Sequence, residues 1–183
     1  MVDTSGVSRF KKRDVLFSLP WCRPMPISQE SVRQHTAHLV VVEDSDEDFD
    51  TLVEAAREAG ITQTIHRVDT GGDCLALLRG QRTDALTLLP ALPALILMDL
   101  NSHGIDGREA LVTIKSEPRL KDIPVVVLTT SANPKDVAFC YQAGANAYHV
   151  KPVRYDQYRL LLTGLLQYWL NAVTPLDAAE KVN

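Results

Sequence analysis

Cysteine is scarce in this chain of 183 residues, which contains only Cys22, Cys74 and Cys140. Their number is odd and their spacing wide, so they form neither a disulfide framework nor a zinc-binding pattern. Free thiols are typical of a reducing compartment, which predicts a cytoplasmic protein. Long apolar runs are also missing. The stretch 86–98 is interrupted by threonine and proline and is shorter than the ~18 residues of a membrane span, so we expect no membrane partner.

An excess of positive charge is absent too, since the net charge is −4. This balance argues against a nucleic-acid partner. Residues 1–37 hold six Lys and Arg against three Asp and Glu, whereas residues 38–183 hold 13 against 20. The asymmetry predicts two regions with different roles. We expect residues 1–37 to form an N-terminal extension, either a flexible arm or a short helix, unless Met25 is the true start.

Five short runs that contain β-branched residues or leucine, the first of them continuously apolar, alternate with segments of helical periodicity from residue 38 onward. The expected strands are 39–42, 65–68, 95–98, 125–128 and 147–150. The expected helices begin near Phe49 and otherwise cover 73–78, 108–116, 136–143 and 155–171. Continuous apolar runs are typical of strands buried on both faces, and their alternation with helices predicts an α/β fold with a parallel sheet. We expect one domain over residues 38–171, an insertion at 80–93 and a tail at 172–183.

Polar residues follow four of these strands. Glu43 and Asp44 follow the first, Asp99 the third, Thr129 ends the fourth, and Lys151 follows the fifth. The carboxyl ends of parallel strands meet at one edge of the sheet, so these groups are expected to converge. Crowded carboxylates need a cation, and oxygen ligands suit Mg²⁺. A carboxylate beside such an ion can accept a phosphoryl group, whose oxygens the ammonium and the hydroxyl would bind.

Five short motifs, in this order and spacing, resemble the receiver domain of two-component response regulators over about residues 38–171. They are Val42-Glu43-Asp44, Leu97-Met98-Asp99, Asp106-Gly107, Leu128-Thr129-Thr130 and Val150-Lys151-Pro152. The resemblance implies the flavodoxin-like (βα)5 fold, with five parallel strands in the order 2-1-3-4-5 and helices on both faces. It places the site where the first and third strands meet.

The resemblance also implies a role for each site residue. Asp99 would be the phospho-acceptor, and Thr129 and Lys151 would bind the phosphoryl oxygens. Thr129 and Tyr148 would move as the switch pair. The implied Mg²⁺ ligands are the side chains of Glu43, Asp44 and Asp99 and the backbone carbonyl of Asn101.

One loop departs from the family pattern. His103 stands where proline is usual, and Ser102 and Gly104 flank it. Losing proline and gaining glycine frees the backbone, which leaves the lifetime of the phosphorylated state open. We interpret His103 as an exposed loop residue rather than a group that titrates beside the phosphate. His38, His66 and His149 are expected to be structural.

The partners are predicted from the last helix and the insertion. Leucines cover more than one stripe of helix 155–171, which favours a homodimer through helix 136–143, strand 147–150 and helix 155–171 over core packing alone. The insertion and Tyr168-Trp169-Leu170 resemble receivers that serve phytochromes, which implies a light-sensing histidine kinase, a bacteriophytochrome, as the partner. Residues 1–37 and 172–183 are too short for a DNA-binding domain, so we expect a stand-alone receiver.

Three other functions compete with a phospho-accepting signalling protein, which is itself not a turnover enzyme. A phosphatase of the haloacid-dehalogenase type needs a second aspartate where Asn101 stands. A flavodoxin-like cofactor binder needs a phosphate-binding loop where Glu43 and Asp44 stand. A pseudo-receiver that binds partners without phosphorylation would be favoured by loss of an acid, the threonine or the lysine, yet all are present.

Overall fold

The computed structural model describes residues 38–81, 89, 91–101 and 107–173. Several expectations concern residues outside these ranges. They are the extension 1–37, most of the insertion 80–93, the loop around His103 with Asp106, and the tail beyond residue 173.

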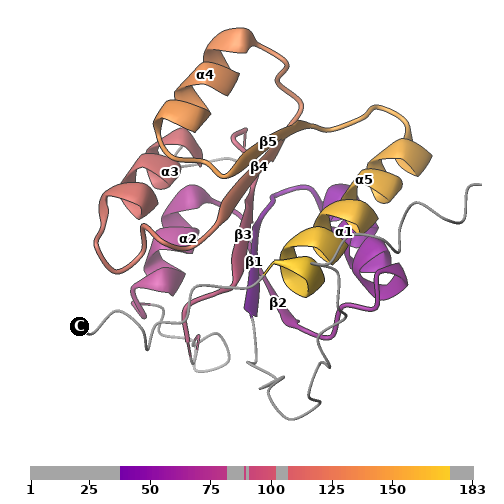
Figure 1. The fold of residues 1–183 in the computed structure, drawn as a ribbon, viewed down its shortest axis with the longest axis horizontal. Helices are drawn as coiled ribbons and strands as arrows, with labels where there is room; N and C mark the ends of the chain where they lie inside the picture. Colours follow the sequence, from indigo (N-terminus) through magenta and orange to yellow (C-terminus); the bar gives the residue numbers. More distant parts are fainter. Residues whose placement is uncertain (1–37, 82–88, 90, 102–106, 174–183) are drawn as a thin grey trace, which may run out of the picture. The chain divides into compact units, whose positions relative to one another are not determined.

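The described residues contain a parallel sheet of five strands in the order β2-β1-β3-β4-β5 (Figure 1). The strands are β1 (His38–Val42), β2 (Thr64–Val68), β3 (Leu95–Met98), β4 (Val125–Thr129) and β5 (Ala147–Val150). Each begins and ends within one residue of its expected position. The predicted flavodoxin-like order is confirmed, with β1 and β3 adjacent at the centre of the sheet.

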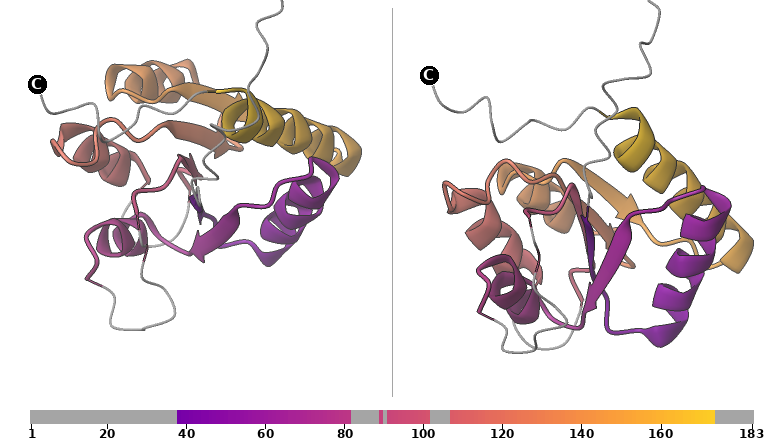
Figure 2. Two further views of the ribbon diagram at one scale, coloured as in Figure 1. Left: turned by 60° about the horizontal axis from the view of Figure 1, so that its bottom comes forward. Right: turned by 90° about the horizontal axis from the view of Figure 1, so that it is seen from below.

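Helices cover both faces of the sheet. They are α1 (Asp46–Glu58), α2 (Gly71–Leu78), α3 (Gly107–Ser116), α4 (Pro134–Gln142) and α5 (Tyr155–Gln167). Helices α1 and α5 lie together on one face, and α2, α3 and α4 lie on the other (Figure 2). Across the described part of the chain, no helix combines the length and the apolar character that membrane crossing requires.

The three central strands, β1, β3 and β4, are buried along their whole length, which accounts for their almost continuous apolar sequence. Val40 and Ile96 belong to the core layer beneath α2, α3 and α4. Leu39, Val41 and Leu97 belong to the layer beneath α1 and α5. Two apolar layers therefore hold the central strands rigidly, and with them the residues at their carboxyl ends.

Short polar residues begin three of the helices just beyond the strands. Ser45 caps α1, Thr70 caps α2 and Asn133 caps α4, each accepting a hydrogen bond from a backbone N–H of the first turn. Pro134 occupies the start of α4, where a missing N–H leaves no helical bond unmade. These caps fix the short connections at the carboxyl edge of the sheet.

The last helix differs from its expected form. We expected one regular helix over 155–171, but α5 ends at Gln167 and a π-helical turn, η1 (Tyr168–Ala172), follows. The Val173 N–H donates to the Tyr168 carbonyl, five residues back, at 3.0 Å. The Tyr168 and Trp169 rings meet edge to face, with centroids 5.5 Å apart. Apolar periodicity cannot reveal this change, because the difference lies in the backbone hydrogen bond and not in the spacing of apolar residues along the sequence.

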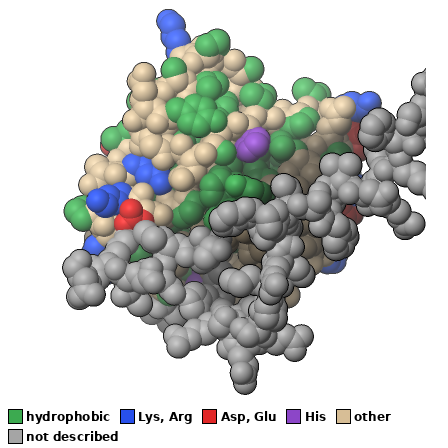
Figure 3. All heavy atoms as spheres, in the orientation of Figure 1, with side chains coloured by type: hydrophobic (Ala, Val, Ile, Leu, Met, Phe, Trp, Pro, Cys, Tyr) green, Lys and Arg blue, Asp and Glu red, His purple; other side chains and the backbone are tan. Residues whose placement is uncertain are grey.

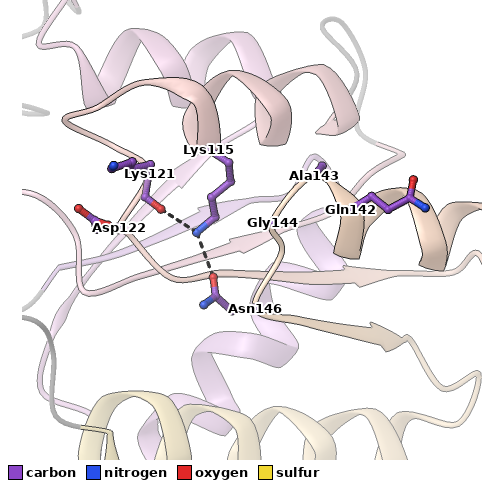
Figure 4. A pocket seen from close by; sticks show the side chains of 7 residues that line it. All are labelled: Lys115, Lys121, Asp122, Gln142, Ala143, Gly144 and Asn146. Atoms are coloured by element: carbon purple, nitrogen blue, oxygen red, sulfur yellow. Dashed lines mark hydrogen bonds between the residues drawn. The ribbon is translucent and has the colours of Figure 1, made fainter.

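The amino ends of β4 and β5 are joined to α3 through the Lys115 ammonium. Its Nζ donates to the carbonyl oxygen of Ile123 at 2.6 Å. It also donates to the carbonyl oxygen of Lys121 at 3.2 Å and to Asn146 Oδ1 at 3.0 Å (Figure 4). Asn146 Oδ1 also accepts from the Val125 N–H at 2.9 Å. Burial lowers the pKa of Lys115. These residues border an open hollow at the end of the sheet opposite to Asp99.

Candidate functional site

The acidic ends of β1 and β3 lie next to each other. Val42 is in register with Met98, and the Asp99 N–H donates to the Val42 carbonyl at 3.0 Å. Glu43 and Asp99 therefore follow at adjacent strand ends, where they are only 4% and 8% exposed. Asp44 comes next and is half-buried. Two central strands thus present carboxylates side by side, as the strand-end pattern predicted.

Lys151 brings a cation to these acids from β5. Its N–H donates to the Thr129 carbonyl at 2.8 Å, which fixes the backbone just after the strand. Its Nζ lies 2.6 Å from Glu43 Oε2, 2.7 Å from Asp48 Oδ2 and 2.8 Å from Asp99 Oδ2. An ammonium has three N–H donors, and three carboxylates accept them here. The cluster is a buried ion-pair network centred on one lysine.

Burial disfavours the charged forms of Glu43 and Lys151, whereas the hydrogen bonds within the network favour them. Burial raises the pKa of Glu43, although its hydrogen bond to Lys151 opposes the rise. For Lys151 burial disfavours the charged form, but the hydrogen bonds to Asp48, Asp99 and Glu43 outweigh it and raise its pKa. The lysine therefore stays charged, and the carboxylates depend on it for compensation.

Asn101 connects Asp99 to the end of β4. Its backbone N–H donates to Asp99 Oδ1 at 2.9 Å, so both oxygens of that carboxylate accept hydrogen bonds. Its side-chain amide donates to Thr129 Oγ1 at 3.0 Å and to Thr130 Oγ1 at 3.2 Å. The sequence assigned Asn101 a backbone role alone. The amide contacts were missed because they depend on how two loops meet.

A chain of hydrogen bonds leads from Thr129 to Tyr148. Thr129 is fully buried, and its Oγ1 accepts from the Ser131 N–H at 3.4 Å. The half-buried Tyr148 hydroxyl donates to the Ser131 carbonyl at 2.8 Å. Ser131 Oγ donates to Asp136 Oδ2 on α4 at 2.5 Å. Ser131 therefore links both residues of the predicted switch pair to the first turn of α4.

Arg67 on β2 holds the acidic loop from the edge of the sheet. Its Nε donates to the Glu43 carbonyl at 2.9 Å and its Nη2 to the Asp44 carbonyl at 3.0 Å. Its Nη1 pairs with Asp46 at 2.5 Å. The Glu43 side chain also accepts from the Ser45 N–H at 3.1 Å. No sequence pattern marks this arginine, which lies more than 20 residues away from Glu43 along the chain.

Gly107 permits the close packing of α3 against the site. A Cβ at this position would lie 2.6 Å from the Asp99 carbonyl oxygen and 2.9 Å from the Leu100 Cα. No side chain fits at these distances, so a glycine is required here. This explains physically the glycine of the Asp106-Gly107 motif.

The donor chemistry of the site suits Mg²⁺. Glu43, Asp44 and Asp99 supply carboxylate oxygens, which this hard cation prefers. Among the described residues, however, no group of three or more His, Cys, Asp and Glu side chains is arranged around a metal position. The Lys151 ammonium provides the positive charge instead.

Two histidines form a pair between the amino end of β1 and the middle of β2. His38 Nδ1 and His66 Nε2 are 2.9 Å apart and share a hydrogen bond. Burial lowers the pKa of His66, and a charge on His38 would lower it further. The pair fastens β2 to β1, in agreement with the structural role expected for it.

Comparison with known proteins agrees with this geometry. The response regulator receiver domain family matches residues 39–163. Response regulator Rcp1 from Synechocystis sp. (strain ATCC 27184 / PCC 6803 / Kazusa) is 37% identical over 136 residues, which cover 74% of this chain and 90% of Rcp1. A crystal structure of the Mn²⁺-bound form of Rcp1 is 35% identical with a TM-score of 0.71, covering 77% of this chain and 99% of that one.

Two solved structures connect the chain to phytochrome systems. The phosphorylated cyanobacterial phytochrome response regulator RcpA is 35% identical with a TM-score of 0.71, covering 77% of this chain and 99% of its own. The bacteriophytochrome response regulator RtBRR is 31% identical with a TM-score of 0.58, covering 79% and 87%. The chain therefore belongs to the response regulator receiver domain family and is related to the phytochrome response regulators.

Proposed function

We propose that this protein accepts a phosphoryl group on Asp99 from a sensor histidine kinase in a Mg²⁺-dependent reaction. The observation that carries the proposal is the 2.8 Å contact between Lys151 Nζ and Asp99 Oδ2 inside a buried acidic cluster. A buried carboxylate that already faces an ammonium has a partner ready for the phosphoryl oxygens. The relatives support this direction, since RcpA is described in a phosphorylated form and Rcp1 in a Mn²⁺-bound form.

The transfer needs positioning and charge neutralisation more than covalent chemistry by the protein. An Asp99 carboxylate oxygen forms a bond to phosphorus while the P–N bond to the kinase histidine breaks, and its electron pair returns to the imidazole. The Lys151 ammonium would exchange its contact with Asp99 for a contact with the phosphoryl oxygens, and the Thr129 hydroxyl would donate to one of these oxygens. Mg²⁺, when bound, would neutralise the remaining negative charge.

The metal would be held by the side chains of Glu43, Asp44 and Asp99 and the backbone carbonyl of Asn101. The phosphoryl group stays on Asp99 until it is hydrolysed or passed on, so the protein is a stoichiometric acceptor and not a turnover enzyme. Rearrangement at Thr129 would reach Tyr148 and α4 through Ser131, whose backbone contacts both residues.

We assign a bacteriophytochrome-type histidine kinase as the partner, because the phytochrome regulator RcpA and the bacteriophytochrome regulator RtBRR are among the similar structures. The net charge of −4 favours output through protein contacts over nucleic-acid binding. We place these contacts in the cytoplasm. Neither nucleic acid nor membrane is part of this proposal.

A homodimer through α4, β5 and α5 is the contact that we propose for the output. Strand β5 is an edge strand whose residues are half-buried or exposed. Exposed apolar side chains come from or adjoin these elements: Phe139, Tyr141, Val150, Val153, Leu160 and Tyr168. Figure 3 shows hydrophobic side chains gathered over the α4 and β5 part of the surface. Burying such a surface would favour association.

The test is phosphorylation by acetyl phosphate with and without Mg²⁺, for the wild type and Asp99→Asn. We expect the wild type to gain one phosphoryl group by intact mass only with Mg²⁺, and the variant to gain none. Gel filtration of the same samples measures association. A folded wild type that gains nothing would favour a pseudo-receiver that binds its partners without phosphorylation.

A further inference from the structure

We propose that Asp48 is a positioning residue that keeps Lys151 at the site while the ammonium exchanges Asp99 for a phosphoryl group. The inference rests on the proposed phosphoryl transfer and adds a residue outside the five motifs. Asp48 belongs to the acidic first turn of α1, where carboxylates suit the positive end of the helix dipole. The structure adds a direct contact, 2.7 Å from Asp48 Oδ2 to Lys151 Nζ.

The direction of the Asp48 side chain is unusual for its place in the helix. Asp48 is the third residue of α1, and its N–H donates to the Ser45 cap at 3.3 Å. An acidic side chain at this position commonly turns back to the N–H of the cap residue. Here the Ser45 N–H is taken by Glu43 Oε1. The Asp48 carboxylate is thereby released from capping and turned toward the lysine.

Asp48 also differs from the other two partners of Lys151. Glu43 and Asp99 belong to the proposed metal set, whereas Asp48 does not. Its side chain is 30% exposed, against 6% and 9% for the side chains of Glu43 and Asp99. Water therefore reaches Asp48, and it can remain paired with the ammonium without support from the buried carboxylates.

This difference matters at the moment of transfer. Before the phosphoryl oxygens arrive, a bound Mg²⁺ would draw on the carboxylates of Glu43 and Asp99, which are two of the three partners of the ammonium. Without Asp48 the ammonium would lose much of its support in a place where its side chain is only 5% exposed. An unpaired buried charge is strongly unfavourable, so the lysine would turn to solvent. With Asp48 in place, one ion pair persists and Nζ stays within reach of the phosphoryl oxygens.

The test compares Asp48→Ala with Glu47→Ala. Glu47 is an exposed neighbour in the same first turn, so its removal matches the change in charge and in helix dipole. At saturating Mg²⁺ we expect phosphoryl uptake from acetyl phosphate to be about ten-fold slower in Asp48→Ala than in Glu47→Ala, because misplacement of a catalytic group lowers the rate. The Mg²⁺ dissociation constants of the two variants should agree. Asp48→Glu should recover part of the rate.

A second readout follows the lysine itself. The ¹H–¹⁵N signal of the Lys151 ammonium, protected from exchange by burial, should survive addition of Mg²⁺ in the wild type and in Glu47→Ala and disappear in Asp48→Ala. Equal uptake rates in the two alanine variants, or a signal that persists in Asp48→Ala, would overturn the inference. If the wild type takes up no phosphoryl group, the proposed function fails, and the ammonium signal alone decides the role of Asp48.

Discussion

Replacing Lys151 by methionine tests how far the site depends on one ammonium. Methionine keeps the length and apolar stem of the side chain, so the packing changes little while the charge is lost. Glu43 and Asp99 then remain buried and charged without their cation. Breaking a buried ion pair by removing one partner costs about 3–5 kcal/mol. For a domain of this size we expect a fall in melting temperature of roughly 10 °C at neutral pH without Mg²⁺.

The loss of stability in Lys151→Met should depend on pH, and Glu43 determines the direction of this dependence. Burial already raises the pKa of Glu43, and the variant removes the lysine that opposes this rise. A carboxyl group whose pKa is raised on folding binds its proton more tightly in the folded state. Its penalty is absent below the unfolded value of about 4.5 and grows as the pH rises through the folded pKa. The stability that the charged Lys151 provides in the wild type is fully present below a pH of about 10.5. It therefore does not change between pH 5 and pH 7.5.

Urea denaturation at pH 5 and pH 7.5 in EDTA measures both effects. Lys135→Met is the matched control, because Lys135 is exposed at the start of α4 and its replacement should change stability by less than about 0.5 kcal/mol. Lys151→Met should lose clearly more stability at pH 7.5 than at pH 5, and adding Glu43→Gln should restore part of it. The reasoning is refuted if Lys151→Met unfolds at pH 7.5 with the free energy of the wild type.

Two further predictions concern backbone packing and acid stability. Gly107→Ala should destabilise the fold by more than about 2 kcal/mol, because its Cβ would overlap the Asp99 carbonyl, whereas Gly164→Ala meets nothing within 4 Å and should gain up to about 1 kcal/mol in α5. Thermal unfolding of both variants checks this, and similar melting temperatures would contradict it. The lowered pKa of His66 beside His38 favours the neutral ring, so stability is present above about pH 6.5 and is lost as the pH falls through the folded pKa. His66→Gln should therefore lose less stability than the wild type between pH 7.5 and 5.5 in urea titrations, and an equal loss would count against this role.

The fold was predictable because its three central strands, β1, β3 and β4, are buried along their whole length and are almost continuously apolar. The edge strands β2 and β5 are more polar, but each strand is followed or ended by a polar residue, which sets the strand bounds within one residue. The end of α5 was not predictable. Tyr168 and its neighbours have the same apolar spacing in a regular helix and in a π turn, and only the backbone hydrogen bond to Val173 distinguishes the two.

The parts of the site that follow from the strand order were predictable. The parts that depend on the direction and length of individual side chains were not. Glu43, Asp99 and Lys151 converge because parallel strands end at one edge. Their chemical roles stay predictions until phosphorylation is measured. Arg67 and Asp48 reach the site over long sequence separations, and their direction follows from bonds that a sequence does not display. In the sequence, Asp48 is one of several acidic residues at the start of a helix, and such residues ordinarily indicate a favourable interaction with the helix dipole.

The Lys115 contacts at the amino ends of β4 and β5 limit how this domain can move. Ile123 lies two residues before β4 and Asn146 directly precedes β5, and both are hydrogen-bonded to α3 by the same ammonium. The strands therefore cannot slide as rigid rods when their carboxyl ends are disturbed. We expect displacement to increase with distance from Lys115 and to be greatest in the connections that follow Thr129 and Val150. A change of charge at one edge of the sheet would then become a change of shape at that same edge, where a partner can detect it.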